Sequence, residues 1–151
     1  MIRSPVVCRG YWNRFEETVA ARRDGWWHTG DMAQRDADGF LWIAARKKDM
    51  IISGAEKIYP GQVEEVILSL SGVVEAAVVG VPDEEWGEAV AAFVVRKPGV
   101  DVNEAKVIQH CLANLASYKK PKHVCFVDEL PRTTVGKVSK EALRRHPPPS
   151  G

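Results

Sequence analysis

The sequence predicts an α+β fold, in which a small domain of about one hundred residues follows a shorter strand-rich segment. Some segments place apolar residues at helical spacing, whereas others are short apolar runs bounded by turn residues. A charged cluster, Arg46–Asp49, separates two apolar stretches and marks the boundary between the segment and the domain. The composition, 45% hydrophobic and 27% charged, is typical of a globular protein.

The strand-rich segment, residues 1 to 46, contains many aromatic residues and two clear turn signals. Asp24-Gly25 precedes a pair of tryptophans, and Asp38-Gly39 precedes the apolar run Phe40–Ala44. Asp-Gly pairs are typical of tight turns that lead into strands. Before the first turn, the stretch from Asn13 to Arg23 predicts one short helix.

Three helices are predicted in the domain that follows. Pro60 opens the first, whose apolar residues recur at helical spacing until Gly72 ends it. Asp101 and Glu104 have the spacing of a capping box ahead of the second helix. The third is expected over Ser139–Arg145, because a run of prolines follows it.

Three apolar runs between these helices predict the strands of the domain. Each run is short and is bounded by residues that favour turns, such as Pro-Asp and Pro-Gly pairs. The predicted strands are Val73–Val81, Glu88–Lys97 and His123–Val127. Strands interspersed with helices in this way indicate one mixed sheet-and-helix core.

Composition and charge argue against several classes of protein. With 21 basic and 20 acidic residues the net charge is +1, so we expect neither a nucleic-acid surface nor a polybasic membrane anchor. The longest apolar run, Ala89–Val95, is too short to span a bilayer, and no secretory leader is expected. The three cysteines, Cys8, Cys111 and Cys125, fit neither a disulfide framework nor a zinc site, so no metal centre is predicted and the expected location is cytoplasmic.

The segment Pro131–Lys137 is the first of three candidate functional motifs. Gly136 immediately before Lys137 provides a flexible backbone that can present one long cation. A P-loop would require Gly in place of Pro131 and Ser or Thr in place of Val138, so that interpretation fails. By itself, a lysine in such a loop is usually a solvated surface residue.

There are two further candidate functional motifs, Trp27–Asp31 and Arg46–Pro60. In the first, the short carboxylate of Asp31 follows a Gly turn and suits hydrogen bonding to a ribose diol, although Gly-Asp is also common in plain turns. The second can be explained as a charged loop, a strand and a helix start. That explanation does not account for three consecutive small residues at Ser53–Ala55.

In this order and at this spacing, the three segments resemble motifs of the adenylate-forming acyl-CoA synthetase family. The resemblance covers residues 3 to 145. It implies that residues 1–46 are the last strand-rich piece of an N-terminal adenylation core and that residues 47–146 are a C-terminal mobile lid. The lid would contain a three-stranded sheet flanked by helices plus a β-hairpin, with residues 147–151 as a tail. Ala45, Ala55 and Gln62 depart from the family's usual Gly, Gly and Glu.

The resemblance also implies an activity for a complete parent protein. Members of the family activate a carboxylic acid with ATP and Mg²⁺ to acyl-AMP and pyrophosphate, after which coenzyme A (CoA) displaces AMP. For this chain the resemblance implies a fatty or aryl acid, with the N-terminal core as a partner. Because the ATP-loading motifs lie upstream in relatives, we expect this polypeptide alone not to form acyl-AMP.

Four residues match the family positions that handle the nucleotide. The resemblance implies that Asp31 holds the ribose hydroxyls and that Arg46 lies near the ribose and phosphates. Lys48 matches the hinge about which the lid swings between the two steps. Lys137 matches the catalytic lysine of adenylation, where a cation between carboxylate and triphosphate offsets their repulsion.

A second set matches positions near CoA. Gly54 and Ala55 would border the pantetheine tunnel, where small side chains leave room for the thiol arm. Trp86 and Tyr118 would lie against the adenine of CoA, and Lys120 near its phosphates. The alternative interpretation is that Trp86 covers the sheet and that the lysines around Lys120 form a solvated loop.

Two other functions stay open at this point. The chain could belong to an adenylation domain that delivers its product to a carrier protein, although the segment Arg46–Gly54 is more similar to free-standing CoA ligases. An isolated lid could also be a non-catalytic binding module. Thermal-shift titration with CoA and AMP separates these possibilities, because only a binding ligand stabilises the folded state.

Overall fold

The computed structural model describes residues 1–145 and divides the chain into two compact units. The N-terminal unit is Met1–Lys48 and the C-terminal unit starts at Asp49. This division lies within the charged cluster Arg46–Asp49, two residues after the boundary between 46 and 47 that the resemblance implies. The end of the predicted lid at residue 146, the predicted tail 147–151 and the prolines expected to stop the last helix lie outside the described residues. Each unit is described by itself below.

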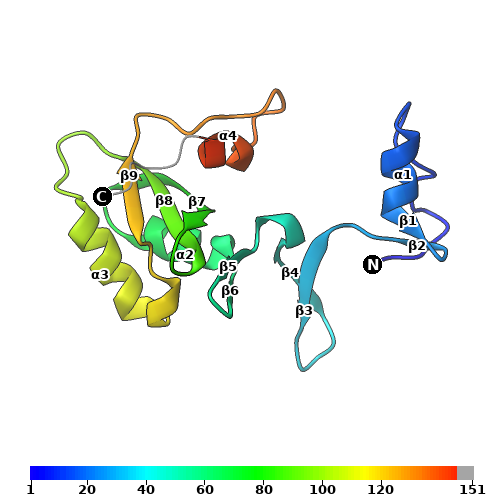
Figure 1. Ribbon diagram of the computed structural model, residues 1–151, viewed down its shortest axis with the longest axis horizontal. Coiled ribbons are helices and arrows are strands. Elements are labelled where there is room, and N and C mark those ends of the chain that lie inside the picture. The colour runs from blue at the N-terminus through cyan, green and yellow to red at the C-terminus, as the bar shows by residue number, and fades with distance from the viewer. Residues whose placement is uncertain (146–151) are drawn as a thin grey trace. The chain divides into compact units, whose positions relative to one another are not determined.

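The N-terminal unit consists of one short helix and two hairpins (Figure 1). Helix α1 (Phe15–Ala21) is shorter than predicted, because the following two residues form β1 (Arg22–Arg23) and pair with β2 (Trp26–Trp27). The turn between these strands has positive φ at both central residues, 50° at Asp24 and 76° at Gly25, as a tight hairpin turn requires. The second hairpin pairs β3 (Asp31–Arg35) with β4 (Leu41–Arg46).

A single mixed sheet forms the centre of the C-terminal unit. Strands β7 (Val73–Asp83) and β8 (Gly87–Arg96) are antiparallel over their full length, and β9 (His123–Phe126) is parallel to β8. The predicted hairpin is β5 (Ile51–Ser53) with β6 (Glu56–Ile58), and it joins the same sheet where Ser53 pairs with Gly87. The expected α+β fold, with three main strands and a hairpin, is therefore confirmed.

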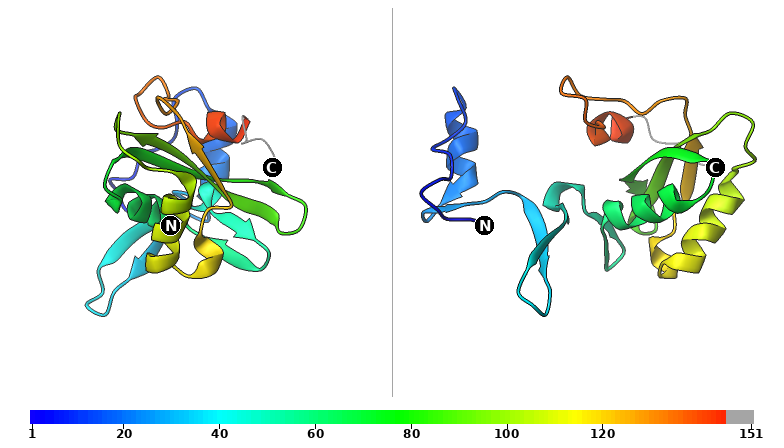
Figure 2. Two further views of the ribbon diagram at one scale, coloured as in Figure 1. Left: turned by 90° about the vertical axis from the view of Figure 1, so that its left-hand side faces the viewer. Right: turned by 180° about the vertical axis from the view of Figure 1, so that it is seen from behind.

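Helices cover both faces of this sheet (Figures 1 and 2). The side chain of Val78 on β7 packs in a cluster with residues of α2 (Pro60–Ser69) and α3 (Glu104–Asn114). Its neighbour Val79 points to the other face, where Leu143 of α4 (Lys140–Arg145) contributes to a second cluster. Because both faces are buried there, the central part of β7, residues 76–82, has no charged residue and is not an alternating pattern.

The start of α3 differs from the prediction. Asn103, not Asp101, is the N-cap, and its side chain accepts a hydrogen bond of 3.0 Å from the backbone N–H of Lys106. Glu104 is consequently the first helical residue, too early to close a capping box. Asp101 lies outside the helix, and its carboxylate pairs with the Lys106 ammonium at 2.6 Å. Across residues 1–145, no helix has the length and apolar character needed to cross a membrane.

Candidate functional site

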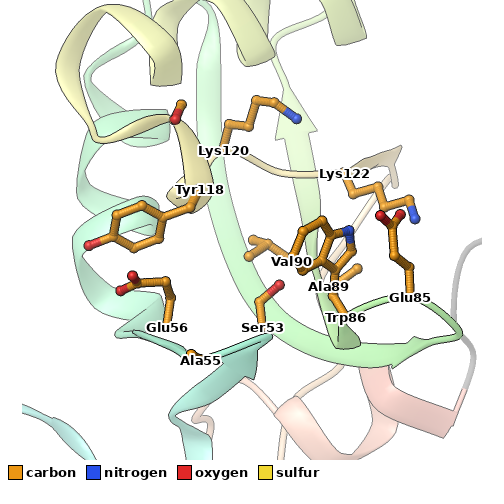
Figure 3. A pocket seen from close by; sticks show the side chains of 11 residues that line it. Ser53, Ala55, Glu56, Glu85, Trp86, Ala89, Val90, Tyr118, Lys120 and Lys122 are labelled. Carbon is orange, nitrogen blue, oxygen red and sulfur yellow. The ribbon is translucent and has the colours of Figure 1, made fainter.

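A pocket of about 560 Å³ lies in the C-terminal unit, within the size range of small-molecule sites (Figure 3). Tyr118, in the 3₁₀ turn η2 (Ser117–Lys119), and Trp86, in the β7–β8 turn, stand on its two sides. Ala89 and Val90 of β8 are apolar residues of its lining. The lining residues are Ser53, Ala55, Glu56, Glu85, Trp86, Ala89, Val90, Ser117, Tyr118, Lys120 and Lys122. Four of the five residues predicted for CoA thus come together here.

The fifth predicted residue, Gly54, lies beneath Trp86 rather than in the lining. Its φ is +61°, at the first central position of the two-residue β5–β6 turn, so glycine is required there. A Cβ atom at this position would lie 3.0 Å from the Trp86 ring, and the Gly54 N–H donates to the Trp86 carbonyl at 2.8 Å. Ala55 has no positive φ, so its methyl group is compatible with the turn.

The β7–β8 turn that carries Trp86 is organised by one carboxylate. Asp83 accepts hydrogen bonds from the backbone N–H groups of Glu85 and Trp86 at 3.1 and 3.0 Å. Its second oxygen accepts from the Lys122 ammonium at 2.6 Å, and the Asp83 side chain is only 6% exposed. The Lys122 hydrogen bond, with the Trp86 N–H, holds the pKa of Asp83 below its usual value, and Asp83 raises the pKa of Lys122.

The lysines of the run 119–122 have different partners. Lys119 donates to the Gln62 side-chain oxygen at 2.9 Å, and Lys122 is paired with Asp83. The side chain of Lys120 has no hydrogen-bond or ion-pair partner among residues 1–145, and it borders the pocket. A free cation beside two aromatic side chains suits a flat ring that carries an anionic group.

The sequence analysis missed several groups of this pocket. Glu56 and Glu85 place carboxylates at its edge, and Asp83 and Lys122 determine where Trp86 lies. The available signals were Asp83, three positions before Trp86, and the basic run that contains Lys122. Neither signal indicates on its own that the two segments meet.

Lys137 lies on a tight loop between β9 and α4. The N–H of Thr133 donates to the Lys137 carbonyl at 2.7 Å, and the N–H of Gly136 donates to the Thr133 carbonyl at 2.9 Å. Gly136 has a φ of +80°, which explains the glycine before the lysine. The Lys137 side chain is exposed and has no partner among the described residues. The loop therefore presents an available ammonium group.

This loop and the pocket lie at opposite ends of the C-terminal unit. In each view the loop stands at the top of the unit, above α4, whereas the β5–β6 hairpin and η2 lie at the bottom (Figures 1 and 2). The sheet separates them. One small domain thus presents a free cation on one side and an aromatic pocket on the other.

The N-terminal unit brings Asp31 and Arg46 together. They face each other across the β3–β4 hairpin, and the Arg46 Nε is 2.9 Å from the Asp31 carboxylate. The Asp31 N–H also donates to the Thr29 hydroxyl at 3.1 Å. Lys48 is exposed in the 3₁₀ turn η1 (Lys47–Asp49), at the last residue of its unit. Within residues 1–145 no group of three His, Cys, Asp or Glu side chains is arranged to hold a metal.

The geometry defines a class of protein: a small α+β domain with a ligand-sized pocket and an exposed loop lysine. Residues 62–137, half of the chain, match the family of the AMP-binding enzyme C-terminal domain, and the chain belongs to this family. The resemblance inferred from the three sequence segments is thereby confirmed.

Relatives whose names state an enzymatic activity are similar to this protein over almost the whole chain. It is 49% identical to the 2-succinylbenzoate–CoA ligase of Bacillus mycoides over 145 residues, 96% of this chain and 30% of the relative. It is 46% identical to a long-chain-fatty-acid–CoA ligase of Mycobacterium tuberculosis, over 95% of this chain and 28% of the relative. The o-succinylbenzoate CoA synthetase of Bacillus subtilis, solved with its acyl-adenylate intermediate, matches with a TM-score of 0.85 and 38% identity, over 95% of this chain and 28% of that one. The chain therefore spans less than a third of the length of these proteins.

Proposed function

We propose that this chain is the C-terminal lid, with the end of the adenylation core, of an AMP-forming acid–CoA ligase. Its substrates are ATP with Mg²⁺, CoA and a carboxylic acid, for which the relatives support a fatty or an aryl acid. It works with an N-terminal adenylation core, in the cytoplasm. The observation that carries the proposal is the placement of Lys137 and the pocket at opposite ends of one domain.

In the first half-reaction the acid carboxylate attacks the α-phosphate of ATP, the bond to the β-phosphate breaks, and pyrophosphate leaves. Two anions must approach, and the Lys137 ammonium offsets their repulsion and stabilises the charge that develops on the phosphate. The side chain suits this role because it is exposed and unpaired on an ordered loop. Asp31 holds the ribose hydroxyls, with Arg46 beside it near the phosphates.

In the second half-reaction the CoA thiolate attacks the acyl carbonyl and AMP leaves. Rotation about Lys48 withdraws Lys137 and brings the pocket forward. Trp86 and Tyr118 hold the adenine of CoA, and Lys120 binds its phosphates. Gly54 and Ala55 border the thiol arm, where the additional methyl group of Ala55 narrows the passage.

A chimera tests both steps, with this chain replacing the equivalent residues of the Bacillus mycoides ligase. Pyrophosphate release with 2-succinylbenzoate measures adenylation, and thioester formation from supplied acyl-adenylate measures the second step. Lys137→Ala should lower adenylation ~10²–10³-fold and spare thioester formation. Lys97→Ala, which removes an exposed lysine outside the pocket and the loop, is the control. Equal loss of both steps in Lys137→Ala would refute the assignment.

Ligand binding can be tested on the 151-residue chain itself. CoA should raise its melting temperature, and Trp86→Ala and Tyr118→Ala should reduce that shift. No response to CoA or AMP would favour a non-catalytic binding module. Acid-dependent ATP–pyrophosphate exchange by this chain alone would contradict the assignment of ATP loading to a separate core.

A further inference from the structure

Arg132 links the Lys137 loop to the central sheet. One nitrogen of its guanidinium group donates to the carbonyl of Gly136 at 3.1 Å. Another nitrogen pairs with the Glu75 carboxylate on β7 at 2.6 Å. The planar guanidinium thus joins the residue immediately before Lys137 to Glu75 on β7, which lies 57 positions before Arg132 in the sequence.

The other hydrogen bonds of the loop act only within it. Thr133 and Lys137 close the turn, and the Ser139 N–H donates to the Pro131 carbonyl at 2.7 Å. These bonds determine the shape of the loop, but none of them connects its tip to the sheet. Arg132 is the described contact that ties the peptide carbonyl at position 136 to the rest of the domain.

We propose that Arg132 and Glu75 are positioning residues for Lys137 in the adenylation step. The proposal rests on the function proposed above. Arg132 fixes the Gly136 carbonyl, and thereby the direction in which the next residue leaves the loop. Transition-state stabilisation requires a cation held close to its productive position, because a displacement of about 1 Å can cost ~10²-fold in rate.

If Arg132 and Glu75 had a purely structural role, loss of their ion pair would lower the stability of the domain. Arg132 and Glu75 are 49% and 37% exposed, and ion pairs at such positions contribute little to global stability. Loss of this pair should therefore leave the melting temperature nearly unchanged while it alters the motion of the loop and the rate of adenylation. Loop motion and the rate of adenylation, compared with the melting temperature, distinguish positioning from structural support.

The first experiment measures ¹⁵N heteronuclear NOE values in the 151-residue chain. Arg132→Gln and Glu75→Gln should lower the values at residues 133–137, and Arg132→Lys should restore only part of the order because it cannot bridge both partners. The matched control is Arg145→Gln, which removes the pair of Arg145 with Glu141. Unchanged values at the loop in Arg132→Gln overturn the proposal.

The second experiment uses the chimera described above. Arg132→Gln and Glu75→Gln should each lower the kcat of adenylation about 10- to 100-fold, with the KM for ATP and the thioester step unchanged. The double variant should be no slower than the slower single variant, since both changes break the same link. Unaltered adenylation in Arg132→Gln overturns the proposal. A chimera without substitutions that makes no acyl-adenylate contradicts the proposed function instead, and the NOE values still decide whether Arg132 orders the loop.

Discussion

The two units of this chain contain similar hairpins but differ in how they bury apolar side chains. In residues 1–48, all of which the structure describes, the only buried hydrophobic side chain is Trp27, at 7% exposure. Trp12 and Phe15 in the same unit are 96% and 81% exposed. In the C-terminal unit, by contrast, Ile58 and Val78 are fully buried within a continuous core.

The difference shows what local turn chemistry achieves and where it stops. Asp24-Gly25 is sufficient to specify a hairpin, but a two-stranded hairpin is at best marginally stable in water. The C-terminal unit adds long-range packing, because α2 and α3 cover one face of its sheet and α4 the other. Large exposed apolar surfaces mark interaction sites, and the proposed function assigns that of the N-terminal unit to the adenylation core.

Hydrogen exchange should separate the units most strongly. Amides of β7 and β8 exchange only through global opening of the C-terminal unit, so they should be slower than those of β1–β4 by on the order of 10⁴-fold or more. Exchange of the 151-residue chain followed by NMR or mass spectrometry measures this ratio. Comparable protection in β3 and β7 would show that the N-terminal unit has a core of its own.

A matched pair of substitutions sharpens the same comparison. Ile67→Ala removes a fully buried side chain from the contact between α2 and the sheet, and should lower the free energy of unfolding by about 2–5 kcal/mol. Ile43→Ala on β4 alters a side chain that is 70% exposed, and should change the free energy of unfolding by less than about 0.5 kcal/mol. Urea unfolding followed by circular dichroism measures both values. Similar losses would contradict the described difference in burial.

Two glycines with positive φ provide a smaller contrast. Gly54→Ala forces a side chain into the left-handed region and against the Trp86 ring, so it should cost the C-terminal unit about 1–2 kcal/mol. Gly25→Ala has a comparable φ, but no atom lies within 4 Å of the added Cβ, and it should leave the unfolding of the C-terminal unit unchanged. Urea midpoints and Trp86 fluorescence test the pair. A Gly54→Ala variant with native stability would argue against the close contact with Trp86.

The sequence predicts elements that depend on neighbouring residues better than it predicts contacts. Pro60 begins α2 as expected, because Pro at the first helical position is a local signal. The cap of α3 was assigned to Asp101, although Asn103 stands directly before the helix and reaches its third N–H. The union of the β5–β6 hairpin with β8 was not predicted, because it depends on Glu88 accepting the N–H of Ile52, 36 positions away.

The same limit applies to the candidate site. Resemblance singled out Ala55, Trp86, Tyr118 and Lys120 one by one, and the structure places all four around one pocket. The resemblance gave no indication of the ion pair between Asp83 and Lys122, which are 39 positions apart. Such pairs arise from the tertiary fold, so local sequence patterns carry little information about them.

The smallest predicted effect concerns this ion pair and pH. The folded-state pKa of Asp83 lies below its ordinary value of 3.8, so its contribution to stability is present above that value and is lost as the pH falls through the folded-state pKa. The contribution of Lys122 has the opposite pH dependence. It is present below pH 10.5, the ordinary pKa of lysine, and is lost as the pH rises through the raised pKa of Lys122. Asp83→Asn should therefore be less stable than the native chain between about pH 5 and 9, with a difference that shrinks in acid.

Urea unfolding from about pH 3 to 7 measures that difference. Asparagine at position 83 can still accept the N–H groups of Glu85 and Trp86, so the variant removes the charge and preserves the turn. Glu84→Gln, which neutralises an exposed carboxylate in the same turn, is the control. In the N-terminal unit Asp31 and Arg46 are directly opposed in one hairpin, whereas Asp83 and Lys122 connect separate segments. A pH-independent difference for Asp83→Asn would mean that the turn hydrogen bonds, and not the long-range ion pair, make Asp83 important.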